Sequence, residues 1–470
     1  MCNVKLVLVY FFCALCIEYA YSESVFRDLY KVKHVPLKDG EDPGEPLILT
    51  PYLEQGKIEE ARNLSIVPEE FFLGIKSYSG YFTVDKNYDS NSFFWFIPAT
   101  DEDYKKVPLL LWLQGGPGGS SIYATFVENG PFRSINETHI ELSRVSWTSN
   151  HSVLYIDNPV GTGYSFTNDR WCSTEEQIGE DLYSALVQFF KLFPELQSND
   201  FFVTGESYAG KFVPAVSYTI HKKNAKSDFK INLKGLTIGN GLSDTVNQLN
   251  YGDYLYQIGL IDDDERDSMK ALEEKTIGLI QEEKYDEAFA VYDTLLNGDL
   301  TKYPTLFKNA TGFDYYYNYL LSNGSDSSLY SVFIQQVDIR RALHVGNLSY
   351  VTDDQVEESL QADFVKSVAP WISELLNHYR VLTYNGQLDI IVAYPLTVNY
   401  LRHLNFSAAD EYKSAKRYEW IVEGDIAGYV KEAGNLTEVL VRNSGHMVPV
   451  DQPEWTLDLI SKFVRNLPLH

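Results

Sequence analysis

A single serine lies where an apolar run meets a turn of small residues. Residues 201–204 are largely apolar, and the sequence Gly-Glu-Ser-Tyr-Ala-Gly at 205–210 follows them before a helix-like stretch. A serine hydroxyl is a weak nucleophile at neutral pH, so it needs a sharp turn to expose it and a nearby base to take its proton. The same pattern also fits an ordinary strand–turn–helix. Ser207 is therefore a candidate nucleophile whose case depends on partners elsewhere.

Two later segments carry an acid and a histidine that could be those partners. Asp389 ends the sequence Tyr-Asn-Gly-Gln-Leu-Asp after one strand-like run, and His446 follows Asn-Ser-Gly after another. Catalytic groups of open α/β sheets lie at the carboxyl ends of strands, and the chain order Ser207, Asp389, His446 is that of α/β hydrolases. With nine histidines and 65 carboxylates in the chain, the order alone could arise by chance. The placement after strands is the stronger evidence.

The rest of the chain supplies the sheet that these side chains require. Aromatic and β-branched runs predict strands at 77–83, 91–98, 108–113, 153–156, 201–204, 233–238, 380–383, 418–422 and 439–442. Amphipathic stretches at 175–193 and 455–464 predict helices. This β-α-β rhythm predicts an α/β fold with a mostly parallel central sheet and helices on both faces.

The length of 470 residues fits one domain with an insertion. We expect a signal peptide at 1–22 and an N-terminal segment at 23–70 that wraps the surface with only irregular structure. The core would occupy 71–245 and 370–470. Between its two parts, residues 246–369 are acidic, helical in pattern and rich in tyrosine, which predicts an inserted helical cap.

The first residues have the composition of a cleaved secretory signal. They contain a lone Lys5, an apolar run at 6–17 and small residues near 22. The run is too short to span a membrane, and no later segment is apolar enough. We therefore predict a secreted protein, with a lysosomal location as the alternative. Eight glycosylation sequons agree with this route: Asn63, Asn136, Asn150, Asn309, Asn323, Asn347, Asn405 and Asn435.

Charge and cysteine content exclude several function classes. The net charge of −26 repels phosphate backbones and anionic lipid, so we expect neither a nucleic-acid nor a membrane partner. Only Cys172 lies outside the predicted signal, so no intrachain disulfide can form in the mature protein. Cys172 is either a buried small hydrophobe or a free or intermolecular thiol. With no cysteine cluster, we expect no metal site.

Five motifs together point to a known family. They are Trp-Leu-Gln-Gly-Gly-Pro-Gly at 112–118, Asp-Asn-Pro-Val-Gly-Thr-Gly-Tyr-Ser at 157–165, the serine turn at 205–210, Asn-Gly-Gln-Leu-Asp at 385–389 and Gly-His-Met-Val-Pro at 445–449. In this order they closely resemble the serine carboxypeptidase family, over about residues 44–463. The chain is most similar to the branch of insect vitellogenic and venom serine carboxypeptidases, which has glutamine at the position of Gln114. The resemblance implies an α/β-hydrolase fold with no cofactor.

The resemblance also implies a role for each candidate residue. Ser207 would attack the C-terminal peptide carbonyl, His446 would take its proton and return it to the leaving amine, and Asp389 would hold the imidazole tautomer. Backbone N–H groups of Gly116 and Tyr208 would form the oxyanion hole. The glycine-rich segment 157–165 lacks a phosphate-loop ending and would shape the site.

Recognition of the free substrate carboxylate falls, by the same resemblance, to Gln114, Glu206 and Glu128. An acid can bind an anion if it is protonated, and burial beside Glu128 would raise the pKa of Glu206. This predicts peptidase activity favoured by acid. The alternative for Glu206 is a turn residue that only caps the next helix.

The chain departs from the family pattern in two places, and other functions stay open. The motif usually continues with a disulfide-bonded cysteine where this chain has Gly119, and Gln114 is one methylene longer than the asparagine of yeast and plant relatives. The leading hypothesis is a secreted or lysosomal serine carboxypeptidase acting on peptide and protein C-termini, with a homodimer left open. The alternatives are an esterase or acyltransferase of the same fold and a non-catalytic secreted binding protein.

Overall fold

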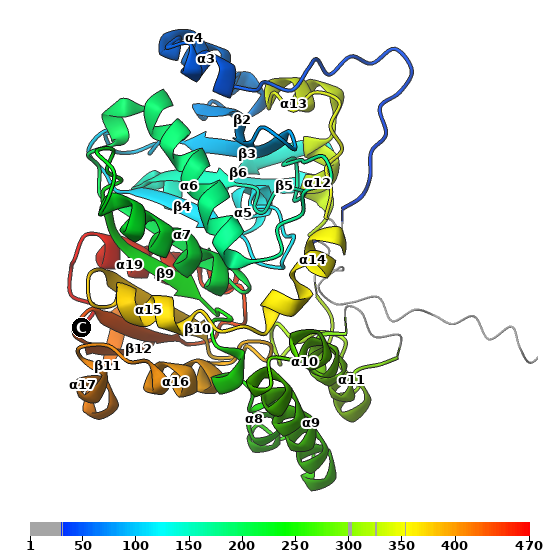
Figure 1. The fold of residues 1–470 in the computed structure, drawn as a ribbon, viewed down its shortest axis with the longest axis vertical. Coiled ribbons are helices and arrows are strands. Elements are labelled where there is room, and N and C mark those ends of the chain that lie inside the picture. Colours follow the sequence, from blue (N-terminus) through cyan, green and yellow to red (C-terminus); the bar gives the residue numbers. More distant parts are fainter. Residues whose placement is uncertain (1–29, 31, 299–302, 325–326, 353) are drawn as a thin grey trace, which may run out of the picture.

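One large sheet forms the centre of the molecule (Figure 1). The computed structural model describes residues 30, 32–298, 303–324, 327–352 and 354–470, so the predicted signal peptide at 1–22 lies outside the described residues. Within them, eleven strands form the sheet in the order β1-β2-β3-β7-β4-β8-β9-β10-β13-β12-β11. Their bounds are β1 (Ile66–Val67), β2 (Ser77–Asp85), β3 (Ser90–Ile97), β4 (Leu109–Leu113), β7 (Ser152–Ile156), β8 (Phe201–Glu206), β9 (Leu233–Gly239), β10 (Arg380–Gly386), β11 (Arg417–Val422), β12 (Asp425–Ala433) and β13 (Leu436–Val441).

The six central strands, from β7 to β13 in the sheet order, pair in parallel. The strands beyond them on both sides pair antiparallel. This confirms the predicted mostly parallel centre. The sequence did not predict β12 or the separate hairpin of β5 (Phe132–Asn136) and β6 (His139–Leu142). Strands β5 and β6 are mostly exposed, and β12 is partly buried but lacks a continuous apolar run.

Helices cover both faces of the sheet, and the alternation of side chains along β8 decides which helix meets which face. Gly205 faces α7 (Ala209–Asn224), where Val213 lies, and α6 (Glu175–Leu192) packs beside α7. Phe202 faces the other side, where its ring lies 6.0 Å from that of Phe463 in α19 (Pro453–Val464). Strand β8 is therefore held between helices on both sides.

A long helical segment separates β9 from β10. It contains α8 (Tyr251–Gln257), α9 (Asp263–Gln281), α10 (Tyr285–Tyr292), α11 (Leu306–Thr311), α12 (Leu329–Ile334), α13 (Val337–Ala342), α14 (Asp354–Phe364) and α15 (Ala369–Leu375). Figure 1 shows α8 to α11 grouped together beyond the sheet, while α15 lies close to α7. The end of α14 reaches the serine turn, because the ring of Phe364 lies 5.2 Å from that of Tyr208.

The N-terminal segment differs from the prediction of irregular structure only. It contains α3 (Thr50–Glu54), α4 (Ile58–Leu64), a 3₁₀ turn at Glu69–Phe71 and the edge strand β1. Leu49, Ala61 and Val67 are buried, so a few widely spaced apolar residues anchor the segment to the core. Such sparse anchors between Pro- and charge-rich stretches leave too weak a periodicity to predict a helix.

Two further predictions concern burial and membranes. Cys172 is buried, and its Sγ lies 3.5 Å from a carboxylate oxygen of Asp181. Burial raises the pKa of this thiol. Cys172 is therefore a buried small side chain, as the first of its two predicted roles requires. In the described part of the chain, no helix has the length and apolar character to cross a bilayer.

Candidate active site

Ser207 occupies a strained turn between β8 and α7. Its φ of 62° is unusual for a residue other than glycine. The turn is held by hydrogen bonds from the Ser207 N–H to the Gly239 carbonyl at 3.0 Å and from the Leu242 N–H to the Ser207 carbonyl at 3.0 Å. Strain of this kind persists only where the surroundings over-determine the backbone, and it presents the hydroxyl at the end of the sheet.

Gly115 packs directly against this turn. A Cβ at position 115 would lie 2.7 Å from the Cβ of Ser207 and 2.7 Å from the backbone nitrogen of Tyr208. No side chain fits at that distance, so glycine is required there for a steric reason. Gly115 precedes the predicted oxyanion-hole residue Gly116, and its own role at the turn is visible only in the structure.

The structure brings Asp389 and His446 together, although 56 residues separate them in the sequence. His446 Nδ1 lies 2.9 Å from Asp389 Oδ2, and both side chains are buried. The other carboxylate oxygen of Asp389 accepts from the Ile391 N–H at 3.1 Å. Among the described residues, His446 Nε2 is buried and has no hydrogen-bond partner. An imidazole fixed at Nδ1 with a free Nε2 has the arrangement of a general base.

Asn240 is a site residue that the sequence analysis missed. It follows β9, and its Nδ2 donates to Asp389 Oδ2 at 2.7 Å, the same oxygen that His446 contacts. Its Oδ1 accepts from the Gly386 N–H at 3.2 Å, which ties it to the end of β10. The one available signal was an asparagine directly after a predicted strand, which is common in turns and therefore not specific.

Ser207 opens onto a small pocket that the helical segment completes. The pocket is lined by Gly116, Ser207, Tyr208, Leu242, Tyr292, Asn297, Tyr317, Phe364, Ile391 and Val392. Both predicted oxyanion-hole residues are therefore beside the serine. The Tyr317 ring, which lines the same pocket, lies 5.0 Å from the His446 ring, so the pocket also leads to the imidazole.

The predicted carboxylate-binding residues form a buried cluster next to the serine turn. Gln114 Nε2 donates to Glu128 Oε1 at 2.9 Å and lies 3.4 Å from Glu206 Oε1. The indole N–H of Trp112 donates to the side-chain oxygen Oε1 of Gln114 at 3.0 Å, which fixes the orientation of the side-chain amide. Glu206 is the last residue of β8 and immediately precedes Ser207.

Burial controls the protonation of the two acids. It raises the pKa of Glu128 to about 7, although the hydrogen bonds from Gln114 and Glu206 oppose the shift. Burial, and then the charge of Glu128, raise the pKa of Glu206 well above its ordinary value. The raised pKa favours the protonated form of Glu206, which can donate a hydrogen bond.

Tyr30 is a further residue of this cluster that the sequence analysis missed. Its side chain is buried, and its hydroxyl accepts from Gln114 Nε2 at 2.9 Å. Its ring lies 5.0 Å from that of Tyr123 in α5 (Ile122–Val127). No sequence signal links residue 30 to residue 114, because a lone tyrosine in a charged segment resembles any surface tyrosine.

The glycine-rich segment 157–165 folds around a buried acid. The carboxylate of Asp157 accepts from the Tyr164 N–H at 2.9 Å and from the Ser120 hydroxyl at 2.6 Å. Burial raises the pKa of Asp157 to about 6. A Cβ at Gly163 would lie 2.1 Å from that carboxylate, so the glycine makes the close turn possible. Ser120 belongs to the loop of Gln114, so the segment braces one wall of the site.

The predicted glycosylation sites differ in exposure. Six of the eight asparagines are exposed: Asn63, Asn136, Asn309, Asn323, Asn347 and Asn405. Asn150 and Asn435 are half-buried, and Asn435 Nδ2 donates to the Leu376 carbonyl at 2.9 Å. Asn309 is exposed but already has a backbone contact, since its Nδ2 donates to the Pro304 carbonyl at 3.3 Å.

Comparison with known proteins gives the family. The family model for serine carboxypeptidases matches residues 68–466. The chain is 54% identical to the venom serine carboxypeptidase of Apis mellifera over 447 residues, which cover 94% of this chain and 96% of that protein. It is 45% identical to the vitellogenic carboxypeptidase of Aedes aegypti over 465 residues, which cover 97% of this chain and 98% of that protein.

The fold comparison agrees. The structure is similar to that of Kex1(delta)p, a prohormone-processing carboxypeptidase from Saccharomyces cerevisiae, with a TM-score of 0.76 and 25% identity over 86% of this chain and 96% of that chain. This confirms the predicted α/β-hydrolase fold. On the evidence of sequence and fold together, this chain belongs to the serine carboxypeptidase family and is a hydrolase of the serine carboxypeptidase type.

Proposed function

We propose that the protein removes single residues from the C-termini of peptides and proteins through Ser207, His446 and Asp389. Ser207 Oγ attacks the last peptide carbonyl while His446 Nε2 takes its proton. His446 then gives that proton to the leaving amine, and the acyl chain stays on Ser207. A water molecule, deprotonated by His446, hydrolyses the acyl-enzyme and restores the serine.

The backbone N–H groups of Gly116 and Tyr208 would stabilise the charge that develops on the carbonyl oxygen. Both residues line the pocket at Ser207. Neither N–H donates to another group in the described part of the chain, so both are available to a substrate oxygen. Asp389 would hold the tautomer of His446 and stabilise the imidazolium.

The observation that carries the proposal of an exopeptidase is the buried acid pair beside the nucleophile. Glu206, with its raised pKa, lies one residue before Ser207 and contacts Gln114 and Glu128. A neutral carboxyl and an amide offer hydrogen-bond donors to a free substrate carboxylate, where two ionised acids would repel it. A substrate whose C-terminal carboxylate is bound by this cluster, next to Ser207, presents only its last peptide bond to the serine hydroxyl.

The pocket composition supports a preference for apolar substrate side chains. Leu242, Tyr292, Phe364 and Ile391 line it together with Ser207, and α10 and α14 contribute two of these. We propose that the helical segment at 246–369 acts as a cap that builds this wall between the two core parts, 71–245 and 370–470. An aromatic or aliphatic residue next to the scissile bond would bury its surface there.

We also propose that the protein follows the secretory route, to a secreted destination or alternatively a lysosomal one. The support is the signal-like composition of residues 1–22 and the six exposed sequons. Venom and vitellogenic names among similar proteins agree with this route.

The test is release of the C-terminal residue from an N-blocked dipeptide, compared with its C-terminal amide, across roughly pH 4 to 8. We expect faster release from the free carboxylate in acid and none with Ser207→Ala. The amide should retain its activity to higher pH, since it lacks the carboxylate that the acid pair binds. Ester turnover or acyl transfer to an alcohol without peptide release would instead support the esterase or acyltransferase alternative.

A further inference from the structure

We propose that His221, Glu374 and His378 form a binding site for a divalent transition metal, with Zn²⁺ as the expected ion, that links α7 to α15. The three side chains come from α7 and from α15 with the turn that follows it, two regions far apart in the sequence. His221 lies near the end of α7, Glu374 lies in α15, and His378 lies in the turn after α15. This site is independent of the catalytic cluster.

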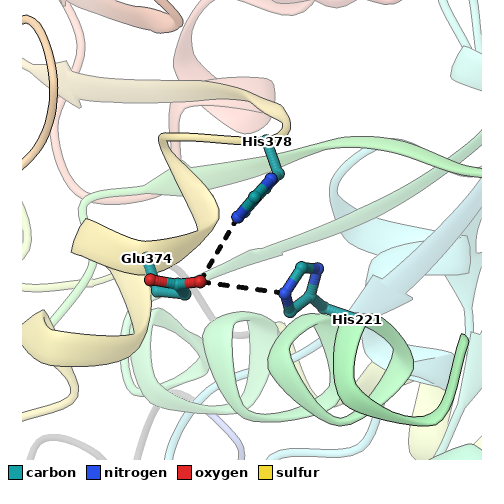
Figure 2. A group of neighbouring side chains, drawn as sticks. All are labelled: His221, Glu374 and His378. Carbon is teal, nitrogen blue, oxygen red and sulfur yellow. Dashed lines mark hydrogen bonds and ion pairs between the residues drawn. The ribbon is translucent and has the colours of Figure 1, made fainter. Parts of the chain in front are cut away.

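The ligand atoms converge on one point (Figure 2). His378 Nε2 lies 3.3 Å from Glu374 Oε1, and His221 Nε2 lies 3.9 Å from the same oxygen. One nitrogen or oxygen atom from each of the three residues lies within 4.8 Å of the others. Figure 2 shows both imidazole rings directing a nitrogen toward the carboxylate of Glu374.

These separations are close to those of a tetrahedral site. Zinc bonds of about 2.0–2.1 Å place two ligands of a tetrahedron roughly 3.3 Å apart. The Glu374–His378 distance of 3.3 Å already fits. His221 must approach Glu374 by less than about 1 Å, and the two imidazole nitrogens, which lie within 4.8 Å of each other, must also reach the tetrahedral separation. Glu374 and His378 are exposed, and small rotations of their side chains can close this gap.

The ligand types select the class of ion. Two imidazole nitrogens and one carboxylate oxygen suit zinc and its neighbours in the transition series, whereas magnesium and calcium prefer oxygen ligands alone. Three protein ligands leave the fourth position of a tetrahedral site open for a water molecule. The exposure of two of the three ligands gives an ion direct access from solvent.

A supporting contact orients the most buried ligand. His221 Nδ1 lies 3.1 Å from the hydroxyl of Tyr379, so its Nε2 is the atom that faces Glu374. Metal-binding histidines commonly use their second nitrogen in such a contact, which fixes the ring.

An ion here would act on stability and not on the chemistry at Ser207. His221 lies about 18 Å along α7 from the start of that helix at Ala209, at a rise of about 1.5 Å per residue. Metal that binds only the folded state stabilises that state. Because the ion would join α7 to α15, it would oppose separation of these two helices.

The experiment is isothermal titration calorimetry, in which ZnCl₂ is added to the full-length glycosylated protein at pH 7.5. The protein is purified without a histidine tag. We expect one saturable site, and a rise in Tm of roughly 3 °C when zinc greatly exceeds Kd. Cobalt as a substitute ion should give the intense visible absorption of a tetrahedral complex. His378→Ala should weaken zinc binding at least 10-fold with unchanged peptidase activity, whereas His403→Ala, an exposed histidine in α16 (Tyr394–His403), should bind as wild type.

Two further variants separate a site from non-specific binding. Tyr379→Phe keeps all three ligands and should weaken binding by about 10-fold, because only the orienting contact is lost. Glu374→Gln should remove the cobalt spectrum. The proposal is wrong if the wild-type protein shows no saturable site, or if His378→Ala and Glu374→Gln bind zinc as tightly as wild type. In that case, the three residues form only a histidine–carboxylate ion pair.

Discussion

Asn240 and Asp389 are joined by a hydrogen bond of 2.7 Å from the amide Nδ2 to the carboxylate Oδ2. The same oxygen contacts His446 Nδ1 at 2.9 Å. Asn240 therefore fixes the carboxylate from the side of β9, while His446 approaches it from the loop after β13. The carboxylate orientation, and with it that of the imidazole, depends on a residue that never touches the substrate pocket.

We predict that Asn240→Gly lowers kcat and leaves KM nearly unchanged. Asn240 has a φ of 41°, which glycine adopts without strain. The substitution therefore keeps the backbone conformation and removes the side chain's hydrogen bonds to Asp389 and from the Gly386 N–H. Loss of a hydrogen bond to a charged group, about 1.5–3 kcal/mol, corresponds to roughly 10- to 100-fold in rate. Steady-state kinetics on the N-blocked dipeptide provide the check. An equal loss in kcat for a substitution at exposed Asn87 would point to a general effect on folding.

The pH dependence of substrate binding should follow Glu128, whose pKa is raised to about 7. Below that pH the acid is neutral. As the pH rises through 7, Glu128 ionises and repels the substrate carboxylate, so KM for the free-acid dipeptide should increase, approaching about tenfold per pH unit. The C-terminal amide should show no such increase.

Glu128→Gln should abolish this rise in KM, since glutamine stays neutral at every pH. The measurement is KM for the free acid and the amide from pH 5 to 8.5 in both proteins. If the variant keeps the wild-type profile, another group controls binding. Glu59→Gln, on the surface of α4, is the matched control.

Tyr30→Phe should weaken carboxylate recognition selectively. The hydroxyl accepts from Gln114 Nε2 at 2.9 Å, and its removal frees the amide to adopt other orientations. A neutral hydrogen bond contributes about 0.5–1.5 kcal/mol, so KM for the free-acid dipeptide should rise roughly 2- to 12-fold. The amide substrate should be unaffected. Equal changes for both substrates would mean that Tyr30 supports the fold only, and exposed Tyr88→Phe should change neither.

Gly115→Ala should inactivate the enzyme without unfolding it. The new Cβ would lie 2.7 Å from the Cβ of Ser207 and 2.7 Å from the Tyr208 nitrogen, so the nucleophile and the oxyanion donor must shift. A displacement of about 1 Å at reacting groups can cost about 100-fold in rate. Gly278→Ala in α9, where nothing lies within 4 Å of the new Cβ, is the control. Circular dichroism of both variants reports whether they fold, and kcat reports their activity. A near-normal kcat for Gly115→Ala would show that the turn can relax.

Much of the fold could be predicted from the sequence because its signals are local. The buried strands β4, β7 and β8 are short apolar runs, and α6 has an apolar face that repeats with helical period. Each pattern reflects how one segment meets the core, so neighbouring residues suffice to recognise it. The predicted positions of Ser207, Asp389 and His446 relied on the same rule, since each follows a strand.

The sequence by itself determined the family, the mostly parallel sheet and the chain positions of the candidate catalytic residues. Only the tertiary structure decided which distant groups meet: Tyr30 with Gln114, Asn240 with Asp389, and His221 with His378. These contacts join segments 84, 149 and 157 residues apart. Contacts of that kind depend on how helices and strands pack in three dimensions, and a tyrosine, asparagine or histidine outside a motif carries no periodicity that names its partner.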